Sequence, residues 1–481
     1  VSDTKMSTIN GQSHKLFTTT DETILNVRNV EIRNGETATN GGAINNAGIT
    51  NLSNVKFTNN IANGTKNDIH NTGVVNIKAG TTTINGGITG NGSLNVKDNG
   101  TLVIADESNG LSQNTLTITS GMVKANAEKI STLTNTISNE GTLEFTGGSN
   151  LNTVTGEGTT KISGNVQNNA VLSQKDVAIT STGELSTKLN KLQLSSNTVK
   201  NDGVVNIENE DVITLDITNL TEGTTGTINL STTDTTHINS TISNNTIELN
   251  SGILTFEDAQ NNIANANLTV NGCMLNLLNN NAQNLNMNKL TLNNDVELLV
   301  DVDLANESMD RLKANSYDVG DHKINVVGMN LLSDSTQSKT EIPFADEEIR
   351  ENVVNMVEQI GKDVENDYQS LAFTPMYKYN VAYGAGTGNF TFEKAELNPA
   401  VLDTPVAQQA NVLAVQNVVN TFSFHHVDTC MNHGSIHSHA NNKYSNKYAL
   451  VEPIKDDLNT NNPLFTKPDH ESVWVKPFVT F

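Results

Sequence analysis

The sequence predicts an all-β fold in which short parallel strands stack as a right-handed parallel β-helix. Three observations favour this fold. First, all eight prolines lie at or after Pro343, and no Tyr or Trp precedes Tyr317. Proline cannot donate to a β-ladder, so its exclusion is expected where nearly every strand is paired on both edges. Second, about one residue in seven is Asn and about one in eight is Thr, residues that suit tight turns and pleated strands.

The third observation is a recurring motif, a Gly followed by three to four residues in strict alternation. Clear copies occupy residues 73–77, 92–96 and 203–207. Alternation places one side chain inside and the next outside, and one coil is too small to bury its own apolar face. We therefore expect a single β-helix over residues 26–335, preceded by an N-terminal tail or cap at 1–25. The side chains expected to point inward are Ile44, Phe57, Val75, Ile77, Leu94, Val96, Leu143, Phe145, Leu254 and Phe256.

Composition and charge exclude several function classes. The formal net charge is −23, so nucleic acid is not an expected partner. The two cysteines, Cys273 and Cys430, lie far apart, and no disulfide framework is expected. No run of about 20 apolar residues occurs, so no transmembrane helix is expected. The chain starts at Val1 without Met or a hydrophobic signal core, which indicates a processed or truncated N-terminus.

A glycine pair and a Phe–Asn pair early in the chain carry a resemblance to a known family. The sequence GGAI at residues 41–44 is followed by FTNN at 57–60. This combination resembles the GGA[ILV] and FxxN motifs of the chlamydial polymorphic membrane proteins and related autotransporter passengers. The matching residues are Gly41, Gly42, Ala43, Ile44, Phe57 and Asn60. The resemblance implies β-helical coils that face host tissue or neighbouring bacteria. The alternative is a single coil with a glycine turn and a core Phe.

A second resemblance lies near residue 300. The sequences DVDL at 301–304, DRL at 310–312 and INV at 324–326 resemble the stretch that closes autotransporter passengers. The resemblance implies a folding-nucleating, autochaperone-like cap over about residues 286–395. Its motif residues here are Asp301, Asp303, Asp310, Arg311 and Leu312.

The acidic residues of this stretch also allow two other interpretations. One is a last coil held by a salt bridge, for instance from Asp310 to Arg311 or Lys313. The other is a catalytic acid pair, because Asp301 and Asp303 are two residues apart and would share a strand face. Apart from Arg311, no basic or aromatic residue lies close by in the sequence, which argues against the acid pair.

The pattern changes after Pro343. Residues 345–360 are acidic and have helical spacing, which predicts a helix. The alternating aromatic residues at 377–383, the glycine-rich segment at 384–388 and the alternation of Phe390 with Phe392 then predict a β-hairpin with an aromatic face. We expect this hairpin to cover the open end of the solenoid, in a cap or junction over residues 336–395.

A helix is expected after the hairpin. Thr404 and Pro405 form a helix start, and apolar residues follow at three- and four-residue spacing between Val412 and Phe422. These features predict a linker helix over residues 396–432. In the resemblance, a helix at this position threads the pore of an outer-membrane barrel. An ordinary amphipathic helix is the alternative.

The last segment extends the resemblance. After a linker at 433–472, the sequence VWVKPFVTF at 473–481 resembles the first barrel strand of the autotransporter translocator. Trp474 would then lie in the aromatic girdle of the barrel. Because a barrel needs at least eight strands, we expect the barrel domain itself to be absent from this chain.

One cluster of candidate metal ligands lies between these segments. His426, Cys430, His433 and His437 would share one face of a continuing helix, and such ligands suit Zn²⁺. However, Gly434 disfavours an unbroken helix, and the spacing matches no known zinc motif. A solvated linker is the favoured alternative, so no metal and no cofactor are expected.

The sequence lacks the residues that a β-helical enzyme would need. Such enzymes use clustered acids or bases and aromatic platforms for sugars, whereas the densest acids, Glu208, Glu210 and Asp211, have no Trp or Tyr nearby. The glycine-rich segment at 384–388 does not open a helix, so nucleotide binding is not indicated. We therefore expect no catalytic residue and no enzymatic activity.

These observations predict a surface-displayed autotransporter passenger that acts as an adhesin or a structural cell-surface protein. The alternative is a polysaccharide-acting β-helix enzyme, a lyase or a glycosidase. The expected location is the bacterial cell surface, at the outer membrane, after export through the periplasm. The expected partners are a host-cell or matrix receptor or neighbouring bacteria, together with the protein's own outer-membrane barrel domain.

Overall fold

The computed structural model describes residues 6–188, 198–208, 212–213, 216–358 and 371–397. These residues form a β-solenoid of about 13 turns, with 61% of the structure in strands and no α-helix. The predicted all-β fold of stacked parallel strands is thus confirmed. The chain divides into two compact units, residues 1–248 with 265–267 and residues 249–264 with 268–481.

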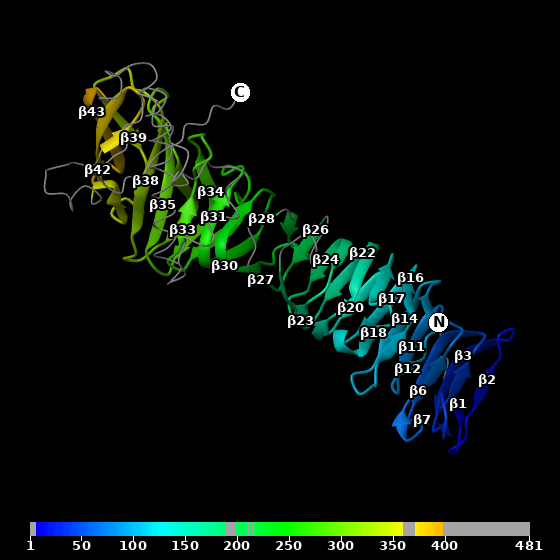
Figure 1. The fold of residues 1–481 in the computed structure, drawn as a ribbon. Coiled ribbons are helices and arrows are strands. Elements are labelled where there is room, and N and C mark those ends of the chain that lie inside the picture. Colours follow the sequence, from blue (N-terminus) through cyan, green and yellow to red (C-terminus); the bar gives the residue numbers. More distant parts are fainter. Residues whose placement is uncertain (1–5, 189–197, 209–211, 214–215, 359–370, 398–481) are drawn as a thin grey trace, which may run out of the picture. The chain divides into compact units, whose positions relative to one another are not determined.

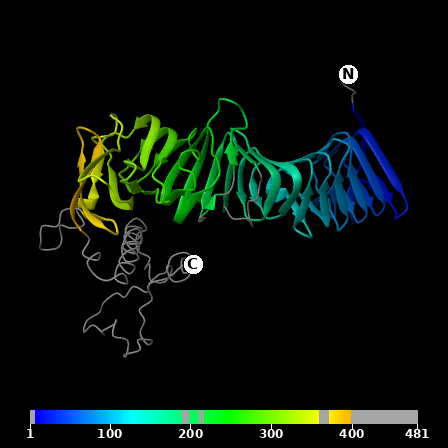
Figure 2. The same cartoon turned by 90° about the horizontal axis from the view of Figure 1, so that it is seen from above.

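The first unit is built around a long parallel sheet, in which each coil pairs with the coil before it and the coil after it. Val75, for example, lies opposite Thr50 of one coil and Leu94 of the next. Figure 1 shows β11, β14, β17 and β20 side by side, and Figure 2 shows the coils, from blue to cyan, as stacked loops. The strands of this sheet are β1 (Ser7–Asn10), β3 (Ile24–Arg33), β6 (Ile49–Thr58), β10 (Val74–Ile77), β11 (Gly80–Ile84), β13 (Ser93–Val96), β14 (Gly100–Ile104), β16 (Thr115–Ile118), β17 (Gly121–Ala125), β19 (Thr136–Asn139), β20 (Thr142–Phe145), β22 (Thr153–Ile162), β24 (Leu172–Ile179), β26 (Thr198–Asn201) and β29 (Asp216–Thr218).

Shorter strands complete the coils of this unit. One sheet contains β2 (Phe17–Thr19), β5 (Ile44–Asn46), β9 (Ile69–Asn71), β12 (Ile88–Thr89), β15 (Leu111–Gln113) and β18 (Ile130–Thr132), and a small one contains β4 (Glu36–Thr37), β7 (Ile61–Ala62) and β8 (Thr65–Lys66). The later coils add β21 (Gly148–Asn150), β23 (Asn165–Asn168), β25 (Glu184–Lys188), β27 (Val204–Glu208), β28 (Val212–Ile213) and β30 (Gly226–Ile238), and a 3-10 turn, η1 (Ala127–Lys129). Parallel pairing starts at Ser7, within the segment 1–25 that was expected to be a tail or cap.

Alternation along the strands decides which side chains form the core. All ten side chains that were predicted to point inward are buried, and the most exposed of them, Phe256, is only 3% exposed. Each fully buried Val, Leu, Ile or Phe side chain contributes about 1.5–3 kcal/mol relative to an exposed one. The inward positions read from the sequence are therefore confirmed.

Buried amides also link neighbouring coils where the short strands end. Thr19 Oγ1 donates to Asn46 Oδ1 (2.6 Å), and Asn46 Nδ2 donates to Asn71 Oδ1 (2.7 Å). Asn71 Nδ2 then donates to Gln113 Oε1 at 2.5 Å. All four side chains are at most 6% exposed. Because buried polar groups must be paired, each amide fixes the position of its counterpart, which lies in the next coil or, for Asn71 and Gln113, two coils away.

The second unit combines stacked parallel strands with a separate antiparallel sheet. In the parallel part, β31, β33, β35, β38 and β40 pair in that order, and β34 pairs with β32 and β37. In the antiparallel sheet the order is β39-β43-β42-β41. The elements are β31 (Asn245–Phe256), which enters this unit at Leu249, β32 (Asn267–Val270), β33 (Met274–Asn276), β34 (Asn284–Leu292), β35 (Val296–Asp303), β36 (Ser308–Met309), β37 (Arg311–Asp318), β38 (Ile324–Ser333), β39 (Lys339–Pro343), β40 (Val353–Asn355), η2 (Met356–Glu358), β41 (Leu371–Phe373), β42 (Tyr377–Gly384) and β43 (Asn389–Leu397).

The predicted aromatic hairpin is present. β42 and β43 pair antiparallel on either side of the glycine-rich turn. Tyr379, Phe390 and Phe392 are fully buried, and Phe390 meets Phe344 edge-on with ring centroids 5.1 Å apart. Such edge-to-face pairs contribute about 0.5–1.5 kcal/mol beyond the buried area.

The helix expected at residues 345–360 is wrong for the part that the structure describes. That part contains a turn, β40 and the 3-10 turn η2. β40 pairs with β38, so that Val353 lies opposite Ile324. The backbone of residues 353–355 therefore continues the sheet, and tertiary pairing overrides a helical spacing that is only a local preference.

Several expected features lie outside the described residues. They are the linker helix at 396–432 beyond Leu397, the linker at 433–472 and the barrel-like strand with Trp474. Residues 396–397 belong to β43 instead of a helix. Within the part of the chain that the structure describes, no helix has the length and apolarity of a membrane span.

The burial pattern predicts the effect of a core truncation. Leu94 is fully buried and lies between Val75 and Leu116 of the neighbouring coils. Leu94→Ala should lower the free energy of unfolding by about 2–5 kcal/mol, because it leaves a cavity between coils. Urea denaturation followed by far-UV circular dichroism measures this change. The adjacent outward substitution Ser93→Ala should change stability by less than about 0.5 kcal/mol, and equal effects of the two would contradict the inward assignment.

Candidate functional site

The two motif glycines lie where the chain turns into β5, against backbone from other parts of the stack. Gly41 has a φ of +68°, which disfavours residues with a Cβ. A Cβ on Gly41 would lie 2.0 Å from the Ile44 carbonyl oxygen. A Cβ on Gly42 would lie 2.5 Å from the Ile61 nitrogen and 2.7 Å from the Asn67 oxygen. Both glycines are therefore required by the close approach of backbone segments.

Phe57 and Asn60 anchor the same coil from the other side of the motif. Phe57 is fully buried in the core. The equally buried Asn60 side chain accepts from the Gly35 N–H (2.9 Å) and donates to the Ile32 carbonyl (3.2 Å). Asn60 Nδ2 also lies 2.8 Å from Asp68 Oδ1. The amide thus satisfies backbone groups of the preceding coil while it holds a carboxylate.

Asp68 is the partner that completes this network, and the sequence analysis missed it. Asp68 is completely buried, at 0% exposure. Asp68 Oδ2 accepts from the N–H groups of Asn85 (2.9 Å) and Gly86 (2.6 Å). Burial raises the pKa of Asp68 to about 6, and the hydrogen bonds from Asn60 and the backbone oppose this rise. The only signal in the sequence was a single Asp directly before the short strand Ile69–Asn71.

Two further carboxyl groups are buried side by side in the second unit. Asp301 and Asp310 are both 0% exposed. Asp310 Oδ2 accepts from the Asp301 N–H (2.6 Å), and Asp310 Oδ1 accepts from the Gln283 N–H (2.8 Å). The backbone N–H of Asp310 in turn donates to the Asp301 carbonyl at 2.9 Å. The strand end and the following turn are thereby locked together.

Asp301 uses its own carboxylate to hold a neighbouring loop. Its Oδ2 accepts from the N–H groups of Asn279 (2.7 Å) and Asn281 (3.2 Å), and its Oδ1 accepts from Asn330 Nδ2 (2.6 Å). Burial raises the pKa of Asp301 above its usual value, although these hydrogen bonds oppose it. Burial also raises the pKa of Asp310 to about 8, and the nearby Asp301 charge adds to that rise.

Asp303 does not join this pair. Its carboxylate accepts from the N–H groups of Ala305 (3.2 Å) and Asn306 (3.3 Å) and from the Ser333 hydroxyl. Burial opposes ionisation, but the bonds from Ser333 and Asn306 outweigh it and lower the pKa of Asp303. Asp301 and Asp303 therefore share no partner, and a catalytic pair of these two residues is not formed. The fifth motif residue, Leu312, is a buried core residue at 2% exposure.

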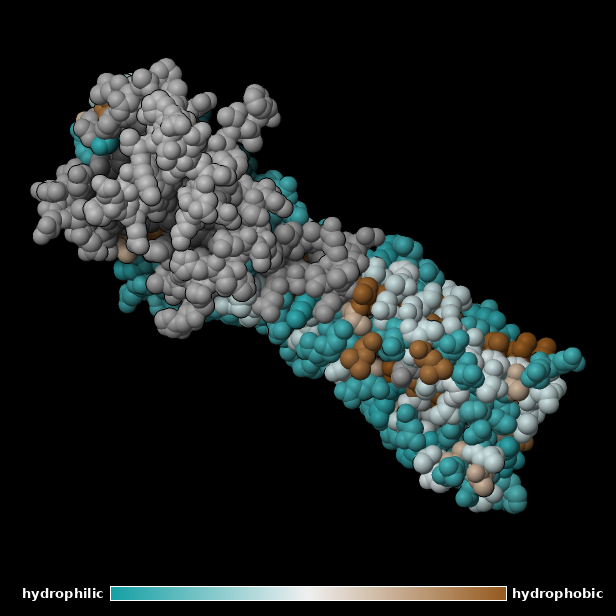
Figure 3. Space-filling view, viewed as in Figure 1, coloured by the Kyte–Doolittle hydropathy of each residue, from teal (hydrophilic) through white to brown (hydrophobic). Residues whose placement is uncertain are grey.

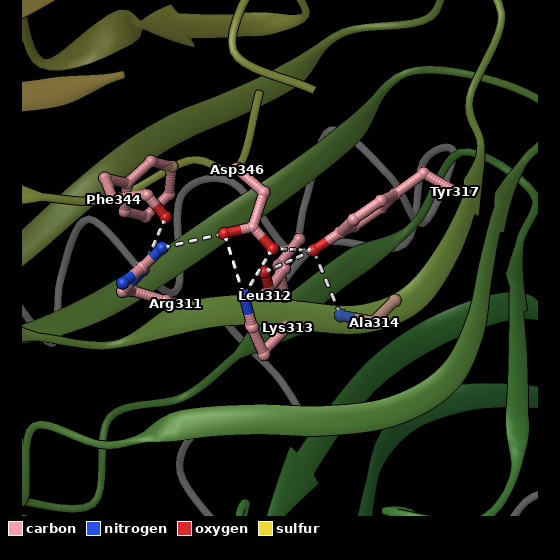
Figure 4. A network of polar contacts seen from close by, with 7 residues as sticks. All are labelled: Arg311, Leu312, Lys313, Ala314, Tyr317, Phe344 and Asp346. Carbon is pink, nitrogen blue, oxygen red and sulfur yellow. Dashed lines mark hydrogen bonds and ion pairs between the residues drawn. The ribbon is translucent and has the colours of Figure 1, made fainter. Parts of the chain in front are cut away.

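The salt bridge expected from Asp310 to Arg311 or Lys313 is wrong, because both cations pair with Asp346 instead. Arg311 Nη2 and Lys313 Nζ lie 3.0 Å and 2.9 Å from the Asp346 carboxylate. Arg311 Nε also donates to the Phe344 carbonyl at 2.9 Å. Figure 4 shows Asp346 between these side chains. The physical reason is burial, since Asp310 points into the core while the long cationic side chains reach the surface.

Tyr317 completes the Asp346 network. Its hydroxyl donates to Asp346 Oδ2 (2.7 Å) and accepts from the Ala314 N–H (3.0 Å). Burial works against ionisation of Asp346, but bonds from Lys313 and Tyr317 and the Lys313 and Arg311 charges lower its pKa. Burial is the main reason why the pKa of Tyr317 is raised, and the bond to Asp346 adds to it. The network ties β37 to the segment before β40.

The outward strand positions carry regular columns of polar side chains. In the first unit, Asn51 Nδ2 donates to Asn26 Oδ1 (2.8 Å), Asn76 Nδ2 to Asn51 Oδ1 (2.9 Å) and Asn95 Nδ2 to Asn76 Oδ1 (3.1 Å). The register continues this column through Thr117. A second ladder in the other unit consists of Asn250, Asn271 and Asn293, with bonds of 2.6 Å and 2.8 Å.

The remaining candidates are the metal ligands and acids considered in the sequence analysis, and most of them lie outside the described residues. Among the residues that the structure describes, no group of three or more His, Cys, Asp or Glu side chains could hold a metal ion. The candidates His426, Cys430, His433 and His437 lie outside the described residues. Of the acids considered for an enzyme, Glu208 is exposed at the end of β27, and Glu210 and Asp211 also lie outside the described residues.

Comparisons with known proteins add no assignment to this geometry. No protein-family model, no curated protein and no solved structure matches the chain. The geometry gives several of the motif residues a role in supporting the backbone. Gly41 and Gly42 permit close approach, while Asn60 and Asp310 satisfy buried N–H groups. Gly41, Gly42, Asn60 and Asp310 are all buried.

The Asn60 network predicts a large effect of one amide. Asn60→Ala should lower the free energy of unfolding by about 2–4 kcal/mol, because it leaves the buried Gly35 N–H without an acceptor and removes the side-chain donor from Asp68 Oδ1. The matched control is Asn51→Ala, which removes an amide from the outward ladder and should cost less than about 1 kcal/mol. Urea denaturation of both variants measures the difference. If both variants lost the same free energy of unfolding, the buried Asn60 amide would contribute no more to stability than an outward amide.

The buried carboxyl pair predicts a distinct pH dependence. The pKa of Asp310 is raised to about 8 in the folded chain, above the ordinary value of 3.8. Its stabilising effect is therefore fully present below about pH 4 and is lost as the pH rises through about 8. Asp310→Asn cannot ionise, so it should flatten the decline of stability between these pH values. At pH 5 it should be less stable than the parent by about 1–3 kcal/mol, because its amide N–H would face a backbone N–H.

Near-UV circular dichroism of urea unfolding from pH 2 to pH 9 tests this dependence, since all seven tyrosines lie from Tyr317 onward. Asp303→Asn is the matched control. The pKa of Asp303 is lowered, so its contribution is present above about pH 4 and is lost as the pH falls. This control should flatten only the acidic side of the profile. A parallel profile for Asp310→Asn and the parent would refute the assignment.

Proposed function

We propose that the chain is the surface-displayed passenger of a bacterial autotransporter and acts as an adhesin or a structural cell-surface protein, without enzymatic activity. The observation that carries this proposal is the outward polar surface. In the first unit, a column of four Asn side chains and Thr117 repeats similar polar chemistry over five successive strands. Such a surface suits extended, multivalent contact better than the turnover of a single bond.

The positions of the acids support the non-catalytic part of the proposal. A glycosidase needs two carboxyl groups about 5–10 Å apart that both face a sugar. In the described residues, Asp68, Asp301 and Asp310 are buried under backbone, and Glu144 is engaged by Lys124 at 2.9 Å. Among the described residues, the aromatic rings that pack against one another lie between Phe344 and Phe392 in the second unit, where Tyr379, Phe390 and Phe392 are themselves buried.

The character of the exposed surface points in the same direction. Figure 3 shows one face on which hydrophilic and intermediate residues prevail, while hydrophobic residues form small separate groups. The exposed large hydrophobic residues include Ile24, Leu133 and Leu151, at 62%, 61% and 68% exposure. Scattered apolar residues of this kind are normal on a soluble surface. The location at the cell surface, the export through the periplasm and the attachment to an outer-membrane barrel follow from the sequence resemblance and belong to the same proposal.

Accessibility on the living cell tests this proposal. Antibodies raised against the purified chain should label intact cells of the bacterium that makes it, and external protease should remove the label while a periplasmic marker stays intact. A strain that lacks the gene is the control. Label that appears only after the outer membrane is permeabilised would contradict surface display. Turnover of plant or host glycans by the purified chain would contradict the non-catalytic assignment.

A further inference from the structure

A strip on the outward face of the first unit combines free amide groups with unpaired cations. It runs across β3, β6, β10 and β13, which lie in parallel register. Its residues, which we call the amide–cation strip, are Asn26, Asn51, Asn95, Arg28, Lys78 and Lys97. Arg28 lies two residues after Asn26 within β3, and Lys78 and Lys97 directly follow the ends of β10 and β13, two residues after the amide column. Two residues of extended chain span about 7 Å.

The three cations of the strip have no acidic partner within the described residues. Arg28 is exposed, and Lys78 and Lys97 are half-buried, so that their alkyl chains lie along the sheet. The N–H of Lys78 bonds to the Leu52 carbonyl and that of Lys97 to the Ile77 carbonyl, both within 2.9 Å. These backbone bonds place the two lysines in one column on adjacent coils.

Further along the same sheet, two lysines are paired with an acidic side chain. Lys124 and Lys161 lie 2.9 Å and 3.5 Å from the carboxylate of Glu144, which stands between them. On the strip, the corresponding position first becomes acidic at Glu140, whose N–H bonds to the Ile118 carbonyl. The positive strip therefore covers the N-terminal coils and ends at a carboxylate.

The amides of the strip keep part of their hydrogen-bonding capacity for a ligand. An Asn side chain has two N–H donors and an oxygen with two lone pairs. Within the ladder, the amide of Asn51 uses one N–H and one lone pair. One N–H donor and one lone pair thus remain at Asn51, and Asn26 and Asn95, at the two ends of the hydrogen-bonded ladder, keep more. Asn26 is exposed, and Asn51 and Asn95 are half-buried.

We infer that the amide–cation strip binds an acidic linear polysaccharide. The carboxylate or sulfate groups of the glycan meet Arg28, Lys78 and Lys97, and its hydroxyl groups pair with the free amide positions. Lys78 and Lys97 are one coil apart, about 4.8 Å, and Arg28 and Lys78 are two coils apart, about 10 Å. A glycan with one acidic group on every ring or every second ring presents its charges on this scale.

The negative net charge of the whole chain favours a ligand of low charge density. The net charge of −23 repels polyanions at long range, but the Debye length at physiological salt is only about 8 Å. A local strip of three cations can therefore act on a flexible chain of low charge density. Duplex DNA carries one negative charge for about every 1.7 Å of its axis. The acidic chain therefore repels duplex DNA more strongly than three cations can offset.

This inference names the ligand class for the adhesive role proposed above and rests on it. The test measures binding of the purified full chain to hyaluronan fragments, which carry one carboxylate in each disaccharide, by calorimetry at low and physiological salt. Arg28→Gln, Lys78→Gln and Lys97→Gln combined should weaken binding about tenfold and reduce its salt dependence. Carboxyl-reduced hyaluronan should bind no better to the parent than to this variant.

The matched control removes the same charge elsewhere in the unit, by Lys15→Gln, Lys66→Gln and Lys129→Gln, and should leave binding within about twofold of the parent. Circular dichroism confirms that both triple variants fold. Equal losses in the two variants, equally tight binding of duplex DNA, or no binding by the parent chain at low salt would each overturn the inference. None of these results would bear on antibody labelling of intact cells, so failure of the strip and failure of surface display are distinguishable.

Discussion

Pairing between successive coils is the constraint on which the rest of this structure depends. No coil can bury its apolar residues or satisfy its backbone alone, so each strand takes its partners from the coils before and after it. The buried amides Asn46, Asn71 and Gln113 extend the same requirement to side chains, because each bonds to a counterpart in another coil. A residue at an inward or turn position is therefore constrained by at least two coils at once.

This constraint explains why the family-like motif residues are structural. Gly41 and Gly42 let one coil approach another, and Asn60 with Asp68 replaces the backbone partners that are lost at a turn. In the second unit, Asp310 does the same for the Gln283 N–H. Carboxyl groups with raised pKa values often indicate catalysis, but here burial beneath backbone is their cause. In the function proposed above, ligand contact falls to the outward positions, which strand pairing leaves free to vary.

The outward positions can vary independently of the fold, and they do so along the sheet. On one half of the main sheet in the first unit, Glu144 neutralises the lysines beside it. On the N-terminal coils of the other half, amides and unpaired cations share a face. Because the columns repeat at the coil spacing of about 4.8 Å, several weak contacts can add up along one extended ligand.

The sequence by itself determined the stacked strands, the inward residues from Ile44 to Phe256 and the aromatic hairpin around residue 386, because alternation and glycine turns are local signals. Only the tertiary structure decided which polar groups meet. Asp346 lies more than 30 residues from Arg311 and Lys313 and still pairs with both, while Asp310 turns inward. The same holds for residues 353–355, which join a sheet despite helical spacing. Coil lengths vary along the chain, so the register between coils, and with it every polar partner, is set by packing and cannot be counted off along the sequence.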